Sequence, residues 1–252
     1  MRPASSSTEL LSRNHRLRPR VLTLRSSLDF NLRPASSHFE LFQRWCDRDL
    51  ESHWAALPWN ALDVPLLPAR LIAGPVELLR WREKFVDDLL AATVASYAEL
   101  HEWMPWASTI PTKAALREVV DAGYASFEAD QEWQYLFREV ETGEVVGGGG
   151  LHKRVGPDGL EIGYWVRSDR TGCGYATAGA GALTDAAFRS LPKLQFLEIA
   201  MDKANHASAQ IPRKLGFRLD REVSRDIVTP GHTGRGLVWM LNRSTWESSR
   251  LI

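Results

Sequence analysis

Two glycines, Gly172 and Gly174, separate a strand-like run from a helix-like run, and this junction constrains the fold most. Residues 163–166 read GYWV, a composition that favours a β-strand. The residues after the glycines have small or apolar side chains at helical spacing, namely Ala176, Ala180, Leu183, Ala187 and Leu191. A helix N-terminus has unpaired N–H groups and a favourable dipole, so this junction suits a phosphate or pyrophosphate. A plain strand-to-helix turn is the alternative on this stretch alone.

The composition excludes several kinds of site and partner. The formal net charge of the 252 residues is zero, so it gives no argument for binding nucleic acid or a membrane. No two of the seven histidines have metal-ligand spacing, and the two cysteines, Cys46 and Cys173, suggest neither a disulfide framework nor a zinc site. No apolar run reaches the roughly 18 residues of a membrane span. We therefore expect a cytoplasmic protein with no metal, nucleic-acid or membrane partner.

Residues 1–60 differ from the rest of the chain. The first 27 residues are rich in Arg and Ser, with Glu9 as their only acid. This composition predicts a basic, largely disordered extension, with an organellar transit peptide as the alternative. Residues 38–56 permit a short amphipathic helix, and a proline-bearing linker follows. Residues 66–247 form the expected folded domain.

The pattern within 66–247 predicts an α+β fold with a mixed sheet. We expect a first strand over 71–81, a helix over 87–101, and a second helix capped by Thr112. Three β-type runs with short turns then predict an antiparallel meander, at 133–140, 145–154 and 160–166. A strand at 194–201, a helix at 205–215 ended by Gly216, and two closing strands complete the order.

A second glycine run, residues 147–150, does not read as a phosphate loop. It is followed by LHKR and not by a helix, and it lacks the Gly-Lys-Ser/Thr ending of a P-loop. The preferred interpretation is a strand whose missing side chains allow another group to approach closely. That group could be a ligand.

Several motifs together resemble the GCN5-related N-acetyltransferases, in the subgroup of RimJ/RimL-type ribosomal-protein N-acetyltransferases. They stand in the family's order and spacing and are the WMPWA run at 103–107, GYWV at 163–166, the glycine loop, NHAS at 205–208, LGF at 215–217 and VWML at 238–241. The resemblance covers residues 66–247 and leaves the first sixty unexplained. It implies a mostly antiparallel sheet flanked by helices, in which the fourth and fifth strands splay apart.

The resemblance also implies acetyl-CoA as co-substrate. The loop N–H groups would hold its pyrophosphate, residues 164–166 would pair with the pantetheine arm, and Asn205 and Ser208 would bind near the thioester. The implied cofactor-binding residues are Tyr164, Trp165, Val166, Arg170, Thr171, Gly172, Cys173, Gly174, Tyr175, Ala176, Thr177, Asn205 and Ser208. Cys173 would contribute its N–H and not its sulfur.

The sequence departs from the family pattern at two positions. The loop usually begins with Gln or Arg, where this chain has Thr171; Arg170, one residue earlier, would supply the charge. Many relatives carry a tyrosine general acid four residues before the LGF glycine, where this chain has Pro212. A mechanism that relies on that tyrosine is therefore not expected here.

Two residues are predicted to act in catalysis. Glu161 shares a strand face with Gly163 and Trp165, beside the expected thioester site, and is the candidate general base. The alternative is a solvated glutamate at a strand end. Glu198 is a second candidate base unless an arginine pairs with it. Ser208 would orient the departing thiolate, although a serine at a helix start is common for structural reasons.

The predicted function is transfer of an acetyl group from acetyl-CoA to a primary amine, with a protein N-terminal α-amine preferred. An α-amine has a pKa of about 8 and is easier to deprotonate than the lysine amine, which has a pKa of about 10.4. The alternatives are a small-molecule or aminoglycoside acetyltransferase, transfer of another acyl group such as succinyl, and a non-catalytic acyl-CoA-binding domain. The expected assembly is a monomer or homodimer.

Overall fold

The structure is a computed structural model that describes residues 66–250, all within one compact unit. The predicted extension over 1–60, its possible short helix and Cys46 lie outside the described residues.

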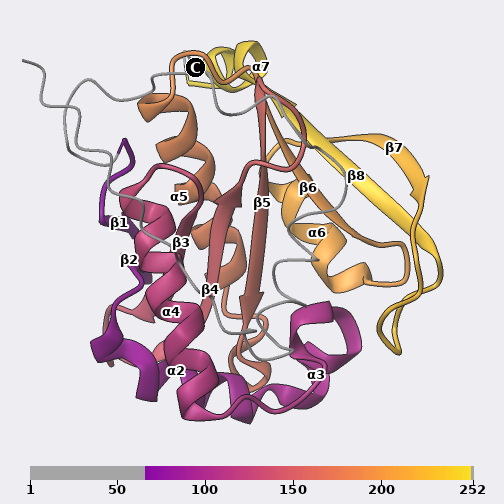
Figure 1. The fold of residues 1–252 in the computed structure, drawn as a ribbon. Helices are drawn as coiled ribbons and strands as arrows, with labels where there is room; N and C mark the ends of the chain where they lie inside the picture. Colours follow the sequence, from indigo (N-terminus) through magenta and orange to yellow (C-terminus); the bar gives the residue numbers. More distant parts are fainter. Residues whose placement is uncertain (1–65, 251–252) are drawn as a thin grey trace, which may run out of the picture. The chain divides into compact units, whose positions relative to one another are not determined.

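Within the described residues, eight strands form one sheet in the order β1-β2-β3-β4-β5-β6-β8-β7 (Figure 1). Their bounds are β1 Arg70–Ala73, β2 Val76–Arg80, β3 Trp133–Glu139, β4 Val145–His152, β5 Gly159–Val166, β6 Phe196–Asp202, β7 Arg218–Ser224 and β8 Arg235–Asn242. Neighbouring strands are antiparallel, except that β5 and β6 are parallel. The mixed, mostly antiparallel sheet and the meander β3-β4-β5 are therefore confirmed.

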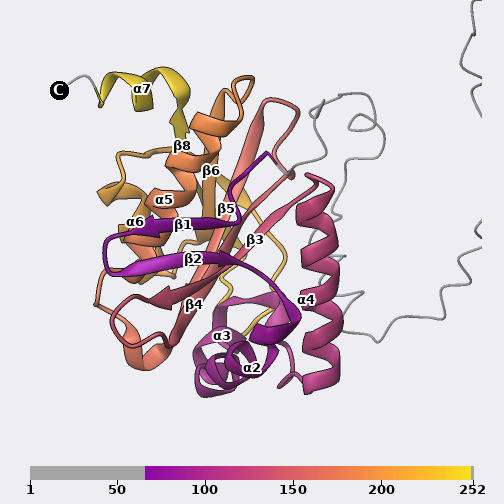
Figure 2. The ribbon, with the colours of Figure 1, turned by 90° about the vertical axis from the view of Figure 1, so that its left-hand side faces the viewer.

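Helices cover both faces of this sheet. The α-helices are α2 Val86–Ala95, α3 Tyr97–Trp103, α4 Lys113–Glu128, α5 Tyr175–Ser190, α6 His206–Lys214 and α7 Arg243–Ser248, with short 3-10 turns at Glu83–Phe85, Pro105–Ala107 and Ser168–Arg170. Helices α5 and α6 lie on one side, and α4 lies on the other (Figure 2). Helix α5 packs on β4 and β5, while α2 packs on β4 and α4 on β3. Both faces of the central strands are thereby removed from water.

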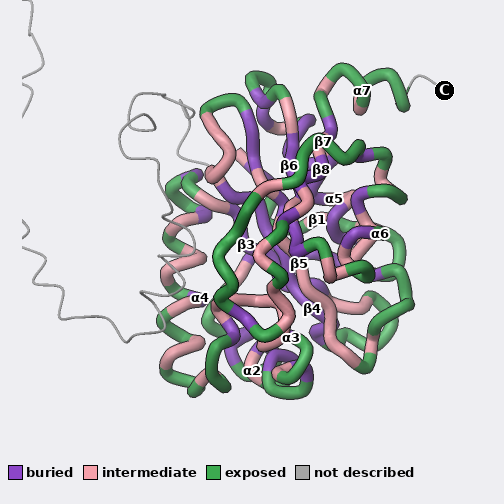
Figure 3. The backbone as a smooth tube through the Cα atoms, turned by 90° about the vertical axis from the view of Figure 1, so that its right-hand side faces the viewer, coloured by how far each residue is buried: buried purple, intermediate pink, exposed green. Residues whose placement is uncertain are grey.

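The central strand β3 contributes to two apolar clusters because its alternate side chains point to opposite faces. Phe137 belongs to the cluster beneath α5, where its ring packs against Gly179. Leu136 belongs to the other cluster, with Leu89 of α2 and Val120 of α4. Buried backbone accordingly follows the central strands, and exposed backbone follows the outer helices and turns (Figure 3).

The expected first strand over 71–81 is wrong, because β1 and β2 form a hairpin there. Gly74 has a φ of +55° and precedes Pro75, and these two residues make a turn that breaks the run. The expected helix over 87–101 is also two helices, interrupted at Ser96. The Ser96 hydroxyl accepts a hydrogen bond from the Ser168 N–H at 3.0 Å, a long-range contact that helix periodicity does not reveal.

Two local signals predicted the ends of helices correctly. The Thr112 hydroxyl accepts a hydrogen bond from the Ala115 N–H at 3.2 Å and caps α4. Gly216 has a φ of +81° just after α6, as a left-handed C-terminal residue requires. Helix α7 was not predicted.

Candidate active site

The strands β5 and β6 diverge along their length. They pair only from Gly159–Glu161 to Phe196–Glu198. Beyond this point β6 continues its ladder with β8 up to Asp202. Within residues 66–250, positions 162–166 of β5 have ladder partners only in β4. The backbone groups of 162–166 that face β6 are therefore available to an extended ligand. The predicted splay of the fourth and fifth strands of the fold corresponds to this opening.

The glycine loop lies beyond the end of β5, just before α5. Gly172 and Gly174 have φ values of +79° and +84°, which residues with a Cβ rarely adopt. Within the described part of the chain, the backbone N–H groups of residues 172–177 donate no hydrogen bond. Since N–H groups at a helix start attract negative charge, this loop can hold an anion.

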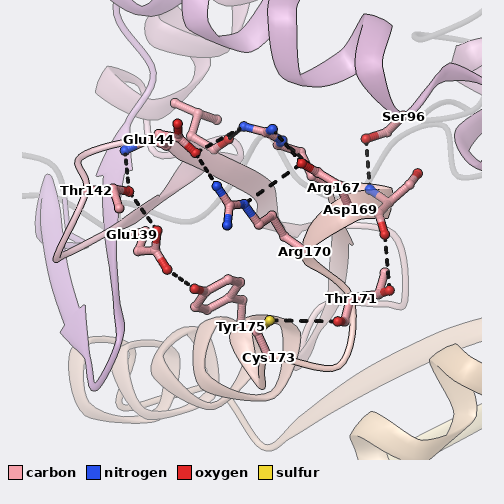
Figure 4. Close-up of polar contacts among 12 residues, drawn as sticks. Ser96, Glu139, Thr142, Glu144, Arg167, Asp169, Arg170, Thr171, Cys173 and Tyr175 are labelled. Atoms are coloured by element: carbon pink, nitrogen blue, oxygen red, sulfur yellow. Dashed lines mark hydrogen bonds and ion pairs between the residues drawn. The ribbon is translucent and has the colours of Figure 1, made fainter.

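Charged side chains surround the loop (Figure 4). Arg170 donates to Glu144 at 2.6 Å, and Arg167 donates to Asp169 at 2.8 Å. The Tyr175 hydroxyl donates to Glu139, and this carboxylate raises the pKa of Tyr175 to about 12. Arg170, expected to supply positive charge to a ligand, is thus paired with an acid of the β3–β4 turn.

Thr171 and Cys173 have exposed side chains at the loop. The Thr171 hydroxyl donates to the Ser168 carbonyl at 3.1 Å. The Cys173 thiol is free and lies 3.8 Å from the Thr171 carbonyl. In residues 66–250 neither side chain has a partner that would activate it, so their contribution to a ligand would come from the backbone.

A cavity of about 190 Å³ opens beside the divergent strands. Residues 162–165 of β5 and 199–202 of β6 line it, as do Asn205 and Ser208. Its other wall is strongly apolar and comes mainly from the helices on the α2 and α4 side, with side chains that include Trp81, Leu89, Trp103, Met104, Trp106 and Leu116. The Trp106 and Trp165 rings lie 6.3 Å apart between centroids. The cavity therefore joins the expected thioester region to an apolar chamber.

The two glutamates expected as candidate bases both have arginine partners. Glu161 lines the cavity, and its carboxylate lies 3.5 Å from Arg154 Nη1. Glu198 is buried and accepts two hydrogen bonds from Arg221, at 2.9 and 3.1 Å. The ion pair with Arg221 gives Glu198 a structural role. The assignment of Glu161 as the catalytic base stays a prediction.

Ser208 and Tyr164 meet at the start of α6. The Tyr164 hydroxyl donates to the Ser208 carbonyl at 3.1 Å and lies 3.2 Å from the Ser208 hydroxyl. The Ser208 carbonyl needs this donor because Pro212, four residues on inside α6, has no N–H. Burial raises the pKa of Tyr164 to about 12. Asn205 caps the helix by accepting from the Ser208 N–H at 3.0 Å.

The structure adds a pair of residues that were not predicted, Glu132 and His152. His152 lines the cavity, and its Nδ1 lies 3.0 Å from Glu132 Oε2. His152 pairs in register with Glu161 across β4 and β5, so both side chains are on the same face. The predicted meander placed these two strands side by side, but only the register identifies which residues face each other.

The four glycines of β4 fit the interpretation of close approach. A Cβ on Gly147 would lie 2.3 Å from the Trp165 carbonyl oxygen, and one on Gly149 would lie 2.7 Å from the Gly163 carbonyl oxygen. Neighbouring strands therefore occupy the space that side chains would need. Gly149 and Gly150 also line the cavity.

Residues 66–250 contain no group of three or more His, Cys, Asp or Glu side chains arranged to hold a metal ion. No helix in this range has the length and apolar composition needed to cross a membrane.

Comparison with known proteins places the chain in a family. The model of the acetyltransferase (GNAT) domain matches residues 76–218. A search of curated proteins found no match. Solved structures with similar folds include RimL, a ribosomal L7/L12 alpha-N-protein acetyltransferase in complex with coenzyme A. It is 18% identical, with a TM-score of 0.63, and 71% of this chain and 98% of RimL are covered.

Two further structures share the fold. RimJ of Mycobacterium smegmatis, in complex with CoA-disulfide, is 20% identical with a TM-score of 0.62 and covers 74% of this chain and 97% of its own. The microcin C7 self-immunity acetyltransferase MccE, in complex with acetyl-CoA and AMP, is 14% identical with a TM-score of 0.61. The match covers 67% of this chain and 92% of MccE. The resemblance seen in the sequence motifs is confirmed, and the chain belongs to the acetyltransferase (GNAT) domain family.

Proposed function

We propose that this acetyltransferase moves an acetyl group from acetyl-CoA to the α-amine of a protein N-terminus by direct attack of the amine on the thioester. The observation that carries the proposal is the opening between β5 and β6, which leads to the open N–H groups of residues 172–177. An extended arm followed by a diphosphate has the shape and charge that these two features require.

The chain's own residues would hold acetyl-CoA mainly through backbone groups. Residues 164–166 present the β5 edge that can pair with the amides of the pantetheine arm. The loop from Gly172 to Thr177 presents N–H groups to the diphosphate, with Arg170 close by. N–H groups of β5 would stabilise the oxyanion, and Asn205 and Ser208 line the cavity where the thiolate would depart.

The cavity favours an acceptor with an apolar group beside its amine. Its helical wall is built from tryptophans and aliphatic side chains. Its acids are engaged: Glu161 pairs with Arg154, and Asp202 accepts two hydrogen bonds from Thr233. A polycationic aminoglycoside would need free carboxylates, so a peptide N-terminus suits the chamber better. RimL and RimJ, which share the fold, include an acetyltransferase of a ribosomal protein N-terminus.

Calorimetry and a thiol-release assay test the proposal together. We expect one acetyl-CoA to bind per chain. We also expect thiol release with short peptides that have a free N-terminus. Control peptides whose α-amine is blocked, and whose free amine is that of a lysine side chain, should give no release. Faster thiol release from succinyl-CoA than from acetyl-CoA would mean that the enzyme transfers a succinyl group. Binding of acetyl-CoA without thiol release for any amine would refute the proposed catalysis and leave a non-catalytic acyl-CoA-binding domain. No binding at millimolar acetyl-CoA would refute the proposal altogether.

A further inference from the structure

The pair formed by His152 and Glu132 has the geometry of an oriented imidazole. His152 is 4% exposed and comes from the last position of β4, while Glu132 directly precedes β3. The Nδ1 atom of His152 lies 3.0 Å from Glu132 Oε2. Burial disfavours the charged form of Glu132, yet His152 and Arg154 hold the pKa of its carboxyl below the usual value. The amide nitrogen of Gln134 also lies 3.5 Å from Nδ1. The nearer Glu132 carboxylate can only accept a hydrogen bond and requires a donor, so Nδ1 carries the proton.

The second ring nitrogen of His152 faces the expected reaction site. A Cβ placed on Gly163 would lie 3.3 Å from His152 Nε2, so this nitrogen is directed at β5 next to Tyr164. Among the described residues, none forms a hydrogen bond with Nε2. Since Nδ1 is protonated, Nε2 has a lone pair and can accept a proton from a group in the cavity.

We propose that His152 is the general base of the acetyl transfer, accepting the amine proton at Nε2, and that Glu132 is its positioning residue. This assignment rests on the proposed function. A third residue that orients a base through its other nitrogen is a recurring arrangement in enzymes, because it fixes the tautomer and stabilises the imidazolium.

The proton and bond changes balance in this scheme. One proton passes from the ammonium of the acceptor to Nε2, which leaves a neutral amine and an imidazolium paired with Glu132. The amine nitrogen then bonds to the thioester carbon, and the C–S bond breaks as the tetrahedral intermediate collapses. The second proton on that nitrogen passes to the departing sulfur, which gives the amide and the free thiol. His152 returns its proton to solvent.

Glu161 is the competing base, since it is the register partner of His152 and lines the same cavity. One oxygen of its carboxylate, Oε1, lies 3.5 Å from Arg154 Nη1 and is engaged by that cation. Ordinary carboxylates are also far weaker bases than imidazoles, which titrate near neutral pH. The arginine partner of Glu161 and the weaker basicity of carboxylates favour His152 as the base.

The decisive variant is His152→Gln, which retains a polar side chain but removes the proton acceptor. We expect it to lower kcat/KM for a peptide acceptor at pH 7 by about 10²–10⁴-fold, with the calorimetric Kd of acetyl-CoA unchanged. The loss must shrink as the pH rises above the amine pKa of about 8, where the amine needs no base. A loss that is equal at every pH, or a change below twofold at pH 7, would overturn the assignment.

Matched carboxylate variants separate the roles of the two glutamates. Glu132→Gln should lower kcat/KM by about 10–100-fold, as loss of an orienting partner does in other sites. Glu118→Gln, on the exposed side of α4, is the control and should not change it. A larger loss in Glu161→Gln than in His152→Gln would move the base to Glu161 and refute the proposal.

A spectroscopic readout keeps this proposal distinct from the proposed function. In ¹⁵N spectra of the wild-type protein, His152 should show a protonated Nδ1 and an unprotonated Nε2, and Glu132→Gln should weaken that preference. A protonated Nε2 at neutral pH would overturn the assignment even if the enzyme is active. Absence of turnover with every amine would instead refute the proposed function.

Discussion

The Tyr164 hydroxyl donates a hydrogen bond to the Ser208 carbonyl, which Pro212 leaves without its helical N–H partner. Pro212 has no N–H, and a tyrosine from β5 satisfies the carbonyl that the proline leaves open. The two residues are coupled through one partly buried acceptor.

This coupling can be measured in a double-mutant cycle. Tyr164→Phe should lower the free energy of unfolding by about 1–3 kcal/mol, because the Ser208 carbonyl loses its donor. In the Pro212→Ala background the helix itself supplies an N–H, so the same change should have a clearly smaller effect. Equal effects of Tyr164→Phe in both backgrounds, by urea unfolding, would show that the two residues act independently.

Arg170 and Glu144 give a prediction about the anion loop. Glu144→Gln removes a negative charge beside the loop and releases Arg170, so acetyl-CoA should bind roughly two- to fivefold more tightly at low salt. The gain should diminish as salt is raised, because these groups are exposed. Calorimetry checks this, with Glu141→Gln on the same turn as the control. Weaker binding by Glu144→Gln would mean that the ion pair positions Arg170 for the ligand.

Gly174 tests the backbone of the loop without a steric clash. A Cβ there would meet nothing within 4 Å, so Gly174→Ala changes only the conformational preference at a φ of +84°. We expect a loss of about 1–2 kcal/mol in stability and a weaker affinity for acetyl-CoA.

Gly74→Ala is the matched control, since Gly74 also has positive φ and open space but lies in the β1–β2 turn. It should lower stability and leave the affinity for acetyl-CoA unchanged. If both variants bind acetyl-CoA as the wild type does, the loop does not hold the ligand in this conformation.

Local signals explain how much of the fold the sequence could predict. Thr112 and Gly216 mark helix ends through their own side chain or backbone, and the meander follows from three short strands with glycine-bearing turns. The hairpin at Gly74 was missed because its two strands are only four and five residues long and weakly patterned. The break at Ser96 was missed because its partner, Ser168, is 72 residues away.

At the site too, local features could be predicted from the sequence, whereas contacts between distant residues could not. The glycine loop was predictable, since positive φ and a helix start are local properties of residues 172–177. The pair of Glu132 and His152 was not, because the two residues are 20 apart and meet only through the register of β3 and β4. Strand pairing without its register leaves facing residues undetermined.

Glu77 predicts a dependence of stability on pH. It is buried and accepts hydrogen bonds from Arg70 and Arg138, each at 2.6 Å. Burial opposes its ionisation, but the two arginines hold the pKa of its carboxyl below the usual value. The stabilisation is therefore complete above the unfolded carboxyl pKa of about 4.3 and is lost as the pH falls through the lower folded value.

Glu77→Gln should lower the free energy of unfolding by about 1.5–3 kcal/mol at pH 7. The difference from the wild type should become smaller below about pH 4. Urea unfolding at several pH values measures it, with Arg70→Gln as the control, because the Arg70 side chain is 60% exposed and should contribute about 1 kcal/mol or less. A difference that grows on acidification would contradict the assigned direction of the pKa.

Trp106 tests whether the apolar chamber selects the acceptor. Its ring belongs to the helical wall of the cavity, and its centroid lies 6.3 Å from that of the Trp165 ring in β5. Trp106→Ala therefore removes apolar contact area without touching the loop that would hold acetyl-CoA. We expect KM for a peptide with an apolar first residue to rise roughly tenfold, the equivalent of losing burial of one large side chain. The Kd of acetyl-CoA should not change.

Trp246→Ala provides the matched control: Trp246 packs on Phe188 in α5 and donates to Asp185, away from the cavity. That variant should be less stable but keep the wild-type KM. If Trp106→Ala leaves KM for apolar peptides unchanged while raising it for polar ones, the chamber does not recognise the apolar group, and the acceptor must approach the thioester by another wall.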